Sequence, residues 1–459
     1  MWPALVVFAL TITGLAIGRI PGLAMDRASI AFVGAVLMLA TGALSLTDAL
    51  SPASIDYETL LLLFSMMVVI GVLRLDGAFD WLSHAALDHI TTPRALLATT
   101  ILLSGVLSAF LVNDIVCVAL TPLVLHIALR MRADPIPHLI GLATAANVGS
   151  VATITGNPQN MLIGLHSRIP YLVFAAHLLP VALIGLVLTF AIIAFVYRRP
   201  LSRSARNVTS VTSTVEAKQA STSEAGTAEA STVEAKQASP LEASTVEAKA
   251  EAAPASAFAS NAVLDPSFRL PRVLSIVVPI ATIVLFCTGL PIPLVAAGAA
   301  AVLLVARTDQ ARIYDEIDWR LLVMFAGLFV VVHAFQLRVV SHWQLAQATA
   351  LTTASPITGL GLSAAALSNI VSNVPAVLLL EPLVHTVPPT HQQTAWLTLA
   401  MASTFAGNLT VIGSVANLIV VERARRDGVH LSFTEYLKAG IPITLLTLAL
   451  GLAWLTLTS

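Results

Sequence analysis

The chain has 459 residues, of which 57% are hydrophobic and only 11% are charged, whereas soluble domains carry about 25% charged residues. This excludes an ordinary soluble protein, and repeated apolar runs of membrane-spanning length predict an all-α polytopic membrane protein. The net charge of −1 gives no indication of nucleic-acid binding, and we expect no nucleic-acid partner. The two cysteines, Cys117 and Cys287, lie in apolar segments, so we expect no disulfide framework, no metal cluster and no cofactor.

In the first part of the chain, apolar segments are predicted at about 2–18, 28–46, 59–74, 95–129, 138–166 and 171–197. Residues 200–268 then have a different composition, rich in Ala, Ser, Thr, Glu and Lys, and they repeat the sequence STVEAKQAS at 213–221 and 231–239. A segment with so little apolar surface does not form a packed core, so we predict a disordered, low-complexity linker at 200–268.

After the linker, the apolar pattern starts again at about 272–290, 292–306, 319–337, 355–387, 395–421 and 436–457. Three motifs of the first half recur in the same order and at nearly constant spacing: IDYETLLLLF at 55–64 with IDWRLLVMF at 317–325, NDIVCVALTPLV from Asn113 with NVPAVLLLEPLV from Asn373, and TGNPQN at 155–160 with IGSVAN at 412–417. This order indicates an internal duplication. We therefore expect residues 1–199 and 269–459 to form two transmembrane repeats.

Arginine residues predict how the repeats are oriented, because cytoplasmic loops carry an excess of positive charge. The arginine-rich loops, which we place in the cytoplasm, contain among others Arg27, Arg74, Arg130, Arg198 and Arg423. The linker is then cytoplasmic, both termini are external, and the two repeats have inverted topology in the cell inner (plasma) membrane. This topology requires 95–129 and 355–387 to be re-entrant hairpins. We expect their arms, at about 15 residues, to be shorter than the roughly 20 residues that span a bilayer.

The tips of the two hairpins are the first candidate site. Asn113 and Asn373 begin the outgoing half-helices, whose amide donors and positive dipole ends favour an anion. An Asn side chain both donates and accepts hydrogen bonds, so it can contact a substrate and a cation. We predict that Asn113, Ser372 and Asn373 bind substrate; the alternative is that these Asn residues only cap the half-helices.

The spans at 138–166 and 395–421 are each interrupted by a glycine-containing motif, so we predict that they are discontinuous helices. Breaks of this kind free carbonyl oxygens, which together with nearby hydroxyls are the hard ligands that Na⁺ prefers. We predict four further substrate-binding residues: Asn157, Asn160, Ser414 and Asn417. We predict four coupling-ion residues here: Thr155, Gly156, Thr410 and Gly413. Asn147 and Asn408 are among the small and polar residues around the breaks. The alternative is a kink whose backbone groups are satisfied by Ser and Thr side chains.

Two acidic residues lie deep in apolar segments. Asp114 follows the first tip directly, so we predict that it carries the coupling proton or cation. Glu381 lies eight residues after Asn373, about 12 Å along a helix, and we expect it near the membrane interface. We also expect His126 and His385 to be interfacial.

The motifs NDIVCVALTP, NVGSVATITGNPQN, SNIVSNVPAVLLLEP and FAGNLTVIGSVANL resemble the ion transporter superfamily of arsenite permeases, divalent anion–sodium symporters, citrate transporters and related sodium/proton antiporters. The resemblance covers both halves but not the linker. It implies inverted repeats with two opposed hairpins, elevator-type transport, coupling to Na⁺ or H⁺, and a homodimer. The dicarboxylate branch carries Ser-Asn-Thr in each hairpin. Here the triplets are Val112-Asn113-Asp114 and Ser372-Asn373-Val374, which are more similar to the arsenite-permease and antiporter branches.

These observations predict a secondary active transporter that moves a small inorganic or organic anion across the lipid bilayer, coupled to Na⁺ or H⁺. The alternative is a Na⁺/H⁺ antiporter in which Asp114 exchanges the two ions. The sequence contains no nucleotide-binding GxxxxGK[ST] motif and no HExxH motif, so we expect neither an ATP-driven pump nor an enzyme. A receptor built on a transporter fold is a third reading, which flux measurements would test.

Overall fold

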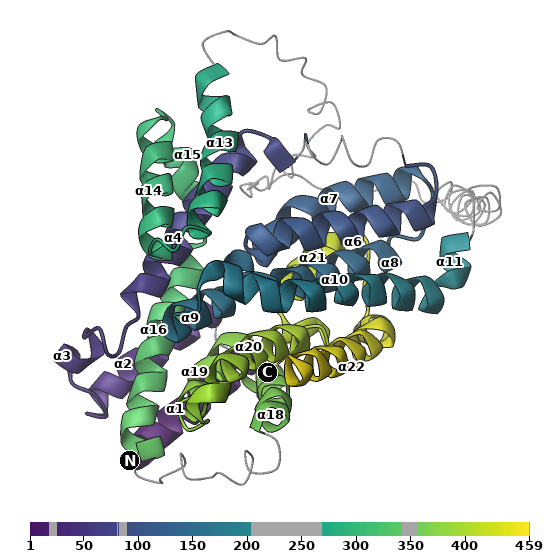
Figure 1. The fold of residues 1–459 in the computed structure, drawn as a ribbon. Coiled ribbons are helices and arrows are strands. Elements are labelled where there is room, and N and C mark those ends of the chain that lie inside the picture. Colours follow the sequence, from purple (N-terminus) through teal and green to yellow (C-terminus); the bar gives the residue numbers. More distant parts are fainter. Residues whose placement is uncertain (18–24, 80, 82–89, 203–268, 342–355, 459) are drawn as a thin grey trace, which may run out of the picture. The chain divides into compact units, whose positions relative to one another are not determined.

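The computed structural model describes residues 1–17, 25–79, 81, 90–202, 269–341 and 356–458, and all regular structure in these residues is helical (Figure 1). The prediction of an all-α protein is confirmed. The predicted linker at 200–268 lies almost entirely outside the described residues.

The first half contains these helices: α1 (Trp2–Ile17), α2 (Arg27–Ala40), α3 (Leu46–Ala49), α4 (Tyr57–Leu75), α6 (Pro93–Phe110), α7 (Asn113–Arg130), α8 (Ile136–Ser150), η1 (Ile154–Gly156), α9 (Pro158–Ser167), α10 (Tyr171–Val196) and α11 (Arg198–Ser202). The pair α6 and α7 forms a hairpin. Helices α8 and α9 are the two parts of a broken helix, because the chain between them leaves the α-helical path.

The second half contains these helices: α13 (Arg269–Phe286), α14 (Ile292–Val305), α15 (Gln310–Asp315), α16 (Trp319–Phe335), the π-helical turn η5 (Gln336–Val340), α18 (Pro356–Val371), α19 (Asn373–Val384), α20 (Pro389–Ala406), η8 (Val411–Gly413), α21 (Val415–Arg426) and α22 (Phe433–Leu457). The order of the first half recurs. A hairpin, α18 and α19, is followed by a broken helix, α20 and α21, and then by a long final helix, α22.

Six helices among the described residues are long and apolar enough to cross a membrane: α4, α6, α7, α10, the continuous stretch of α16 and η5, and α22. The expected arm length of about 15 residues was wrong for the first hairpin, since α6 and α7 each have 18 residues. The helix α6 begins earlier than the apolar pattern, because the Thr92 hydroxyl caps it by accepting a hydrogen bond from the Ala95 amide at 3.2 Å. Length alone therefore does not distinguish a re-entrant first hairpin from a crossing one.

The helices pack in two groups, which we call the hairpin helices (α6–α10 and α18–α22) and the flanking helices (α1, α2, α4, α14 and α16). Within the first group, α6 packs on α8, α18 on α20, and α10 on α22; within the second, α2 packs on α16 and α4 on α14 (Figure 1). Several of these pairs join the two halves of the sequence. The groups contact each other through α1 with α18, α4 with α9, and α16 with α19.

Glycine allows the closest of these helix packings. A Cβ atom on Gly149 of α8 would lie 2.1 Å from the carbonyl oxygen of Gly105 on α6. No side chain fits in that space, so the backbones of the hairpin and the broken helix touch directly. This close contact holds the hairpin tip beside the helix break.

Candidate functional site

The two hairpin tips lie where α7 and α19 begin. Asn113 and Asn373 are both buried, and both line a cavity of about 50 Å³. At the second tip, Ser372 has a φ of 77°, a backbone conformation that side-chain-bearing residues rarely adopt. The tips predicted from two separate motifs thus meet at one cavity. Its other polar lining residues are Arg27, Asp114, Gln159, Ser372 and Ser414.

The first break is held together by an amide. The chain leaves the helix after Ser150, which frees carbonyl oxygens, and Asn160 Nδ2 donates to the carbonyls of Ser150 and Thr153 at 3.1 and 2.9 Å. Asn157 caps α9, since its Oδ1 accepts from the Asn160 amide at 2.8 Å. Both residues are completely buried and lie away from the central cavity. They stabilise the break.

The second break uses the same arrangement. Asn417 Nδ2 donates to the carbonyl oxygens of Gly407 and Thr410 at 2.7 and 3.0 Å. The donor and both acceptors lie 257 residues after their counterparts around Asn160. The motifs TGNPQN and IGSVAN, which are 257 residues apart, therefore form equivalent hydrogen bonds at the two breaks.

These bonds fix the orientation of a chain of Asn amides that joins the two halves. Since Asn417 donates to two backbone carbonyls, its Oδ1 is left as an acceptor, and it receives Asn147 Nδ2 at 3.1 Å. Asn408 Nδ2 donates to the Thr144 carbonyl at 3.2 Å, so its Oδ1 also accepts from Asn147, at 2.8 Å. Backbone carbonyls cannot donate, so this assignment of amide nitrogen and oxygen follows from the network.

The same logic extends to the first tip. Asn147 Oδ1 must accept, and it receives Asn113 Nδ2 at 2.8 Å and the Ser414 hydroxyl at 3.1 Å. Asn113 Oδ1 is then left without a hydrogen-bond partner although it is buried. Asn373 Oδ1 at the other tip is also buried and unpartnered. Such acceptors are costly unless a ligand, ion or water pairs with them, so the tips are suited to bind one.

Asp114 lies beside the tip in the first turn of α7. Its carboxylate interacts electrostatically with the backbone amide of Ala416 in the first turn of α21, and with Arg27 and Asp318. Arg27 begins α2, and Asp318 caps α16 by accepting from the Leu321 amide at 3.0 Å. The predicted coupling carboxylate is therefore placed between a hairpin, a broken helix and two flanking helices.

The other predicted coupling residues do not line this cavity: Thr155, Gly156, Thr410 and Gly413. The Thr155 hydroxyl lies 3.0 Å from the Tyr171 hydroxyl, and a Cβ on Gly156 would lie 2.2 Å from the Ser150 carbonyl oxygen. In the part of the chain that the structure describes, no group of three or more His, Cys, Asp or Glu side chains is arranged to hold a metal ion.

Three residues of the site were missed from the sequence: Arg27, Gln159 and Asp318. Arg27 was used only as a marker of orientation, and Asp318 only as part of a repeated motif. Gln159 lies within TGNPQN, in which only the neighbouring residues were predicted to bind substrate or ion. Its Nε2 donates to the Thr404 hydroxyl at 3.1 Å. The recurrence of Ile-Asp at 55–56 and 317–318 was the one available signal for Asp318.

The central cavity lies next to a larger one, with which it shares four lining residues. Both are lined by Arg27, Leu321, Met324 and Val415, and the larger cavity, of about 700 Å³, extends past Arg423. A separate cavity of about 300 Å³ lies among Asp56, His166 and Glu381 and shares no lining residue with either. The central cavity therefore adjoins the larger cavity near Arg423, and the cavity beside Asp56, His166 and Glu381 is separate from both.

The chain is similar to a known family and to several known proteins. Residues 5–406 match the citrate transporter family. The chain is 35% identical to the silicon efflux transporter LSI3 of Oryza sativa subsp. japonica, over 94% of this chain and 93% of that protein. It is 26% identical to the Dictyostelium discoideum protein named as transporter arsB, over 94% and 87% of the two chains. A solved structure, the YdaH transporter of Alcanivorax borkumensis, is similar with a TM-score of 0.46 and 15% identity, over 99% and 97% of the chains.

The family match covers most of the chain, and the rice relative is similar over nearly its whole length. The resemblance to the ion transporter superfamily is confirmed, and the family and these relatives are named as transporters, not as enzymes. The chain therefore belongs to the citrate transporter family and is a membrane transporter.

Proposed function

We propose that this protein is a secondary active transporter that moves a small anion between the two hairpin tips, coupled to H⁺ or Na⁺, by an elevator-type movement of the hairpin helices against the flanking helices. The observation that carries the proposal is the central cavity. It is lined by both tips, it contains buried amide groups with unpartnered oxygens, and it adjoins a larger cavity at the arginine-rich end. A site open to one side at a time is what alternating access requires.

The matched hydrogen bonds at the two breaks support two repeats built on one plan, and the placement of arginines supports their inverted orientation. The linker is then cytoplasmic, and both termini are external, in the plasma membrane. Asn113 supports a re-entrant first hairpin, because it is buried against the break in the middle of a neighbouring helix. A tip that had crossed the bilayer would lie at the interface instead.

The size of the cavity favours a compact substrate. Its volume is about 50 Å³ on a scale on which one water molecule needs about 10–15 Å³, so it holds roughly three to five waters in this conformation. Two relatives are named for silicon efflux and for arsB. We therefore favour a small inorganic oxyanion or its protonated acid, whose hydroxyl groups would donate to the free oxygens at the tips.

Arg27 separates the two candidate functions. A guanidinium group in the wall of the cavity attracts an anion and disfavours a lone cation. Asp114 faces this arginine, so a protonated Asp114 would leave Arg27 free to pair with the substrate, and an ionised Asp114 would compete for it. A Na⁺/H⁺ antiporter remains the second candidate, because Asp114 and Asn113 place two oxygen ligands side by side.

The test is flux into proteoliposomes, with arsenite, silicate, phosphate, sulfate and citrate offered under an imposed pH or Na⁺ gradient. We expect gradient-driven uptake of at least one small oxyanion. Asp114→Asn should uncouple that uptake from the gradient, and the exposed control Asp427→Asn should behave as the wild type. Na⁺/H⁺ exchange without any added anion would instead establish the antiporter.

A further inference from the structure

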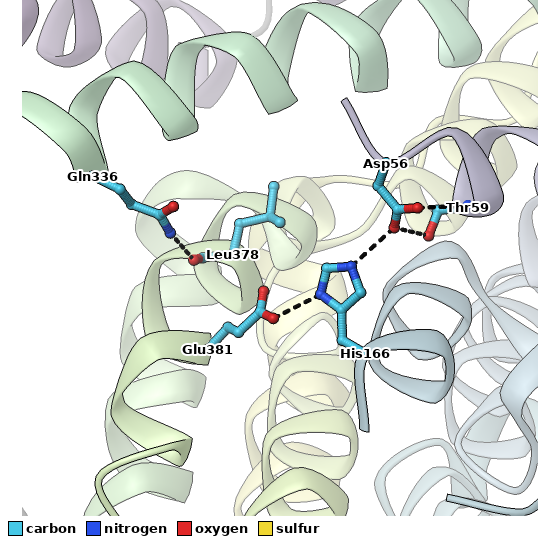
Figure 2. Close-up of polar contacts among 6 residues, drawn as sticks. All are labelled: Asp56, Thr59, His166, Gln336, Leu378 and Glu381. Carbon is cyan, nitrogen blue, oxygen red and sulfur yellow. Dashed lines mark hydrogen bonds and ion pairs between the residues drawn. The ribbon is translucent and has the colours of Figure 1, made fainter. Parts of the chain in front are cut away.

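A polar cluster closes the end of the protein opposite the arginine-rich cavity. His166, at the exposed end of α9, lies between two carboxylates: its Nε2 is 3.1 Å from Asp56 Oδ2, and its Nδ1 is 2.7 Å from Glu381 Oε1 (Figure 2). Asp56 is the N-cap of α4, a flanking helix, whereas His166 and Glu381 belong to hairpin helices from different halves of the chain. The cluster therefore links three elements, and the two groups of helices meet in it.

The geometry requires a proton in this cluster. A neutral imidazole has one N–H and one lone pair, and a lone pair that faces an ionised carboxylate is repelled by it. Both ring nitrogens of His166 are within hydrogen-bond distance of a carboxylate oxygen, so either both carry hydrogen or one carboxyl group is protonated. Asp56 is held as an acceptor, because the amide and the hydroxyl of Thr59 both donate to it. In either case the cluster holds one proton that it would lack with a neutral histidine and two ionised carboxylates.

A second contact at this end joins the same two groups of helices. Gln336, in the π-helical turn after α16, donates from Nε2 to the carbonyl oxygen of Leu378 on α19 at 2.8 Å (Figure 2). The cavity of about 300 Å³ beside the cluster is lined by both contacts. Its titratable lining groups are Asp56, His166, His333, Glu381 and His385. This neutral hydrogen bond does not titrate, so these groups are the local source of any pH dependence of closure at this end.

We propose that Asp56, His166 and Glu381 form a second proton-binding site, which holds this end of the transport path closed while the proton is bound. The inference rests on the proposed elevator mechanism, because the movement of α9 and α19 past α4 is what would separate the three side chains. Loss of the proton leaves one of the two carboxylates facing a ring lone pair and no positive charge between them, and the resulting repulsion favours opening. The site is distinct from Asp114, which lines the central cavity between the two tips.

The pKa values set the pH range. His166 lies in the last turn of α9, at the very end of the predicted span 138–166, where its side chain is partly exposed. Burial lowers the pKa of His166, but the hydrogen bonds to Asp56 and Glu381 outweigh burial and raise it to about 10. Burial raises the pKa of Asp56, but its bonds to His166 and Thr59 bring it below its usual value. Once opened, His166 would return to its ordinary pKa of about 6.5. Closure is therefore fully favoured below about pH 6.5 and weakens as pH rises towards 10, by up to about tenfold per unit.

The experiment measures access to the 300 Å³ cavity. Ser54 is buried and lines it, whereas Thr47 is exposed nearby in the sequence. In full-length protein with Cys287→Ala, a membrane-impermeant thiol reagent is applied to Ser54→Cys and to Thr47→Cys. Each rate is divided by the thiolate fraction of that cysteine, measured by its ultraviolet absorbance, before the ratio of the two rates is taken. The remaining native thiol, Cys117, is buried. We expect this ratio to rise between pH 6.5 and 9.

His166→Gln cannot take up the proton, so the ratio should become independent of pH. Glu381→Gln keeps one carboxylate and should move the pH midpoint down towards 6.5. His385→Gln, beside the same cavity, should leave the wild-type profile unchanged. A flat profile in the wild type, or an unchanged profile in both His166→Gln and Glu381→Gln, overturns the proposal. The measurement needs no transported substrate, so a failure of flux and a failure of this inference are separate results.

Discussion

Replacing Asn160 and Asn417 separately by alanine tests whether the two helix breaks are built on one plan. Each substitution removes an amide that donates to two backbone carbonyl oxygens, and of these four bonds only that to Thr410 is partly buried rather than buried. A buried acceptor left without a partner costs about 1–3 kcal/mol, so each variant should lose about 2–6 kcal/mol of stability. Asn417→Ala also removes the acceptor for Asn147, which adds about 1 kcal/mol, whereas Asn160 Oδ1 has no partner to lose.

The assay is thermal unfolding of purified protein in detergent, with the exposed Gln393→Ala as control. Both Asn variants should unfold at clearly lower temperature than the control, and Asn417→Ala should be the less stable of the two. If neither variant differs from Gln393→Ala, the break carbonyls do not depend on these amides. If Asn160→Ala is the less stable, the bond between the two halves contributes nothing measurable.

Two other predictions follow from packing and composition. Gly149→Ala should destabilise the protein by about 1–3 kcal/mol or more and abolish uptake, because the new Cβ would lie 2.1 Å from the Gly105 carbonyl oxygen. The control is Gly298→Ala, where a Cβ has no atom within 4 Å. Equal Tm values for the two variants would contradict the close packing. Deleting residues 207–262, within the low-complexity linker, should leave the uptake rate of proteoliposomes unchanged, and a loss of uptake would show that the linker has a function of its own.

The sequence identified the fold class and the positions of the hairpin tips and helix breaks. Polar residues stand out in apolar segments, and the duplication marks the same positions twice. Asn113, Asn373 and Asp114 were found in this way, and all three line the central cavity.

The roles within the site were harder to predict. Asn160 and Asn417 were predicted as ligands, but the structure engages their amides with the carbonyls that the breaks release. A sequence shows that an Asn side chain is present in a broken span. It does not show whether that side chain donates hydrogen bonds to the backbone of the break or faces the cavity. Only the geometry of the break decides this.

Contacts between residues on different helices were the hardest to predict from the sequence. Arg27 reaches Asp114, and Asp56 reaches His166, through the packing of flanking helices on hairpin helices. That packing depends on apolar surfaces that differ little from one helix to another, so the sequence pattern does not specify it. Glu381 was predicted near the interface, and its ion pair with the partly exposed His166 was not foreseen.

The central claim is that substrate binds between the two tips, and uptake by an Asn113→Leu variant tests it most directly. Leucine has similar size but neither donates to Asn147 nor offers the free oxygen. We predict that proteoliposomes with Asn113→Leu lose gradient-driven uptake of the oxyanion that the wild type carries, while Gln393→Leu retains it and both proteins remain folded in detergent. Uptake by Asn113→Leu with the wild-type rate and KM would contradict the account.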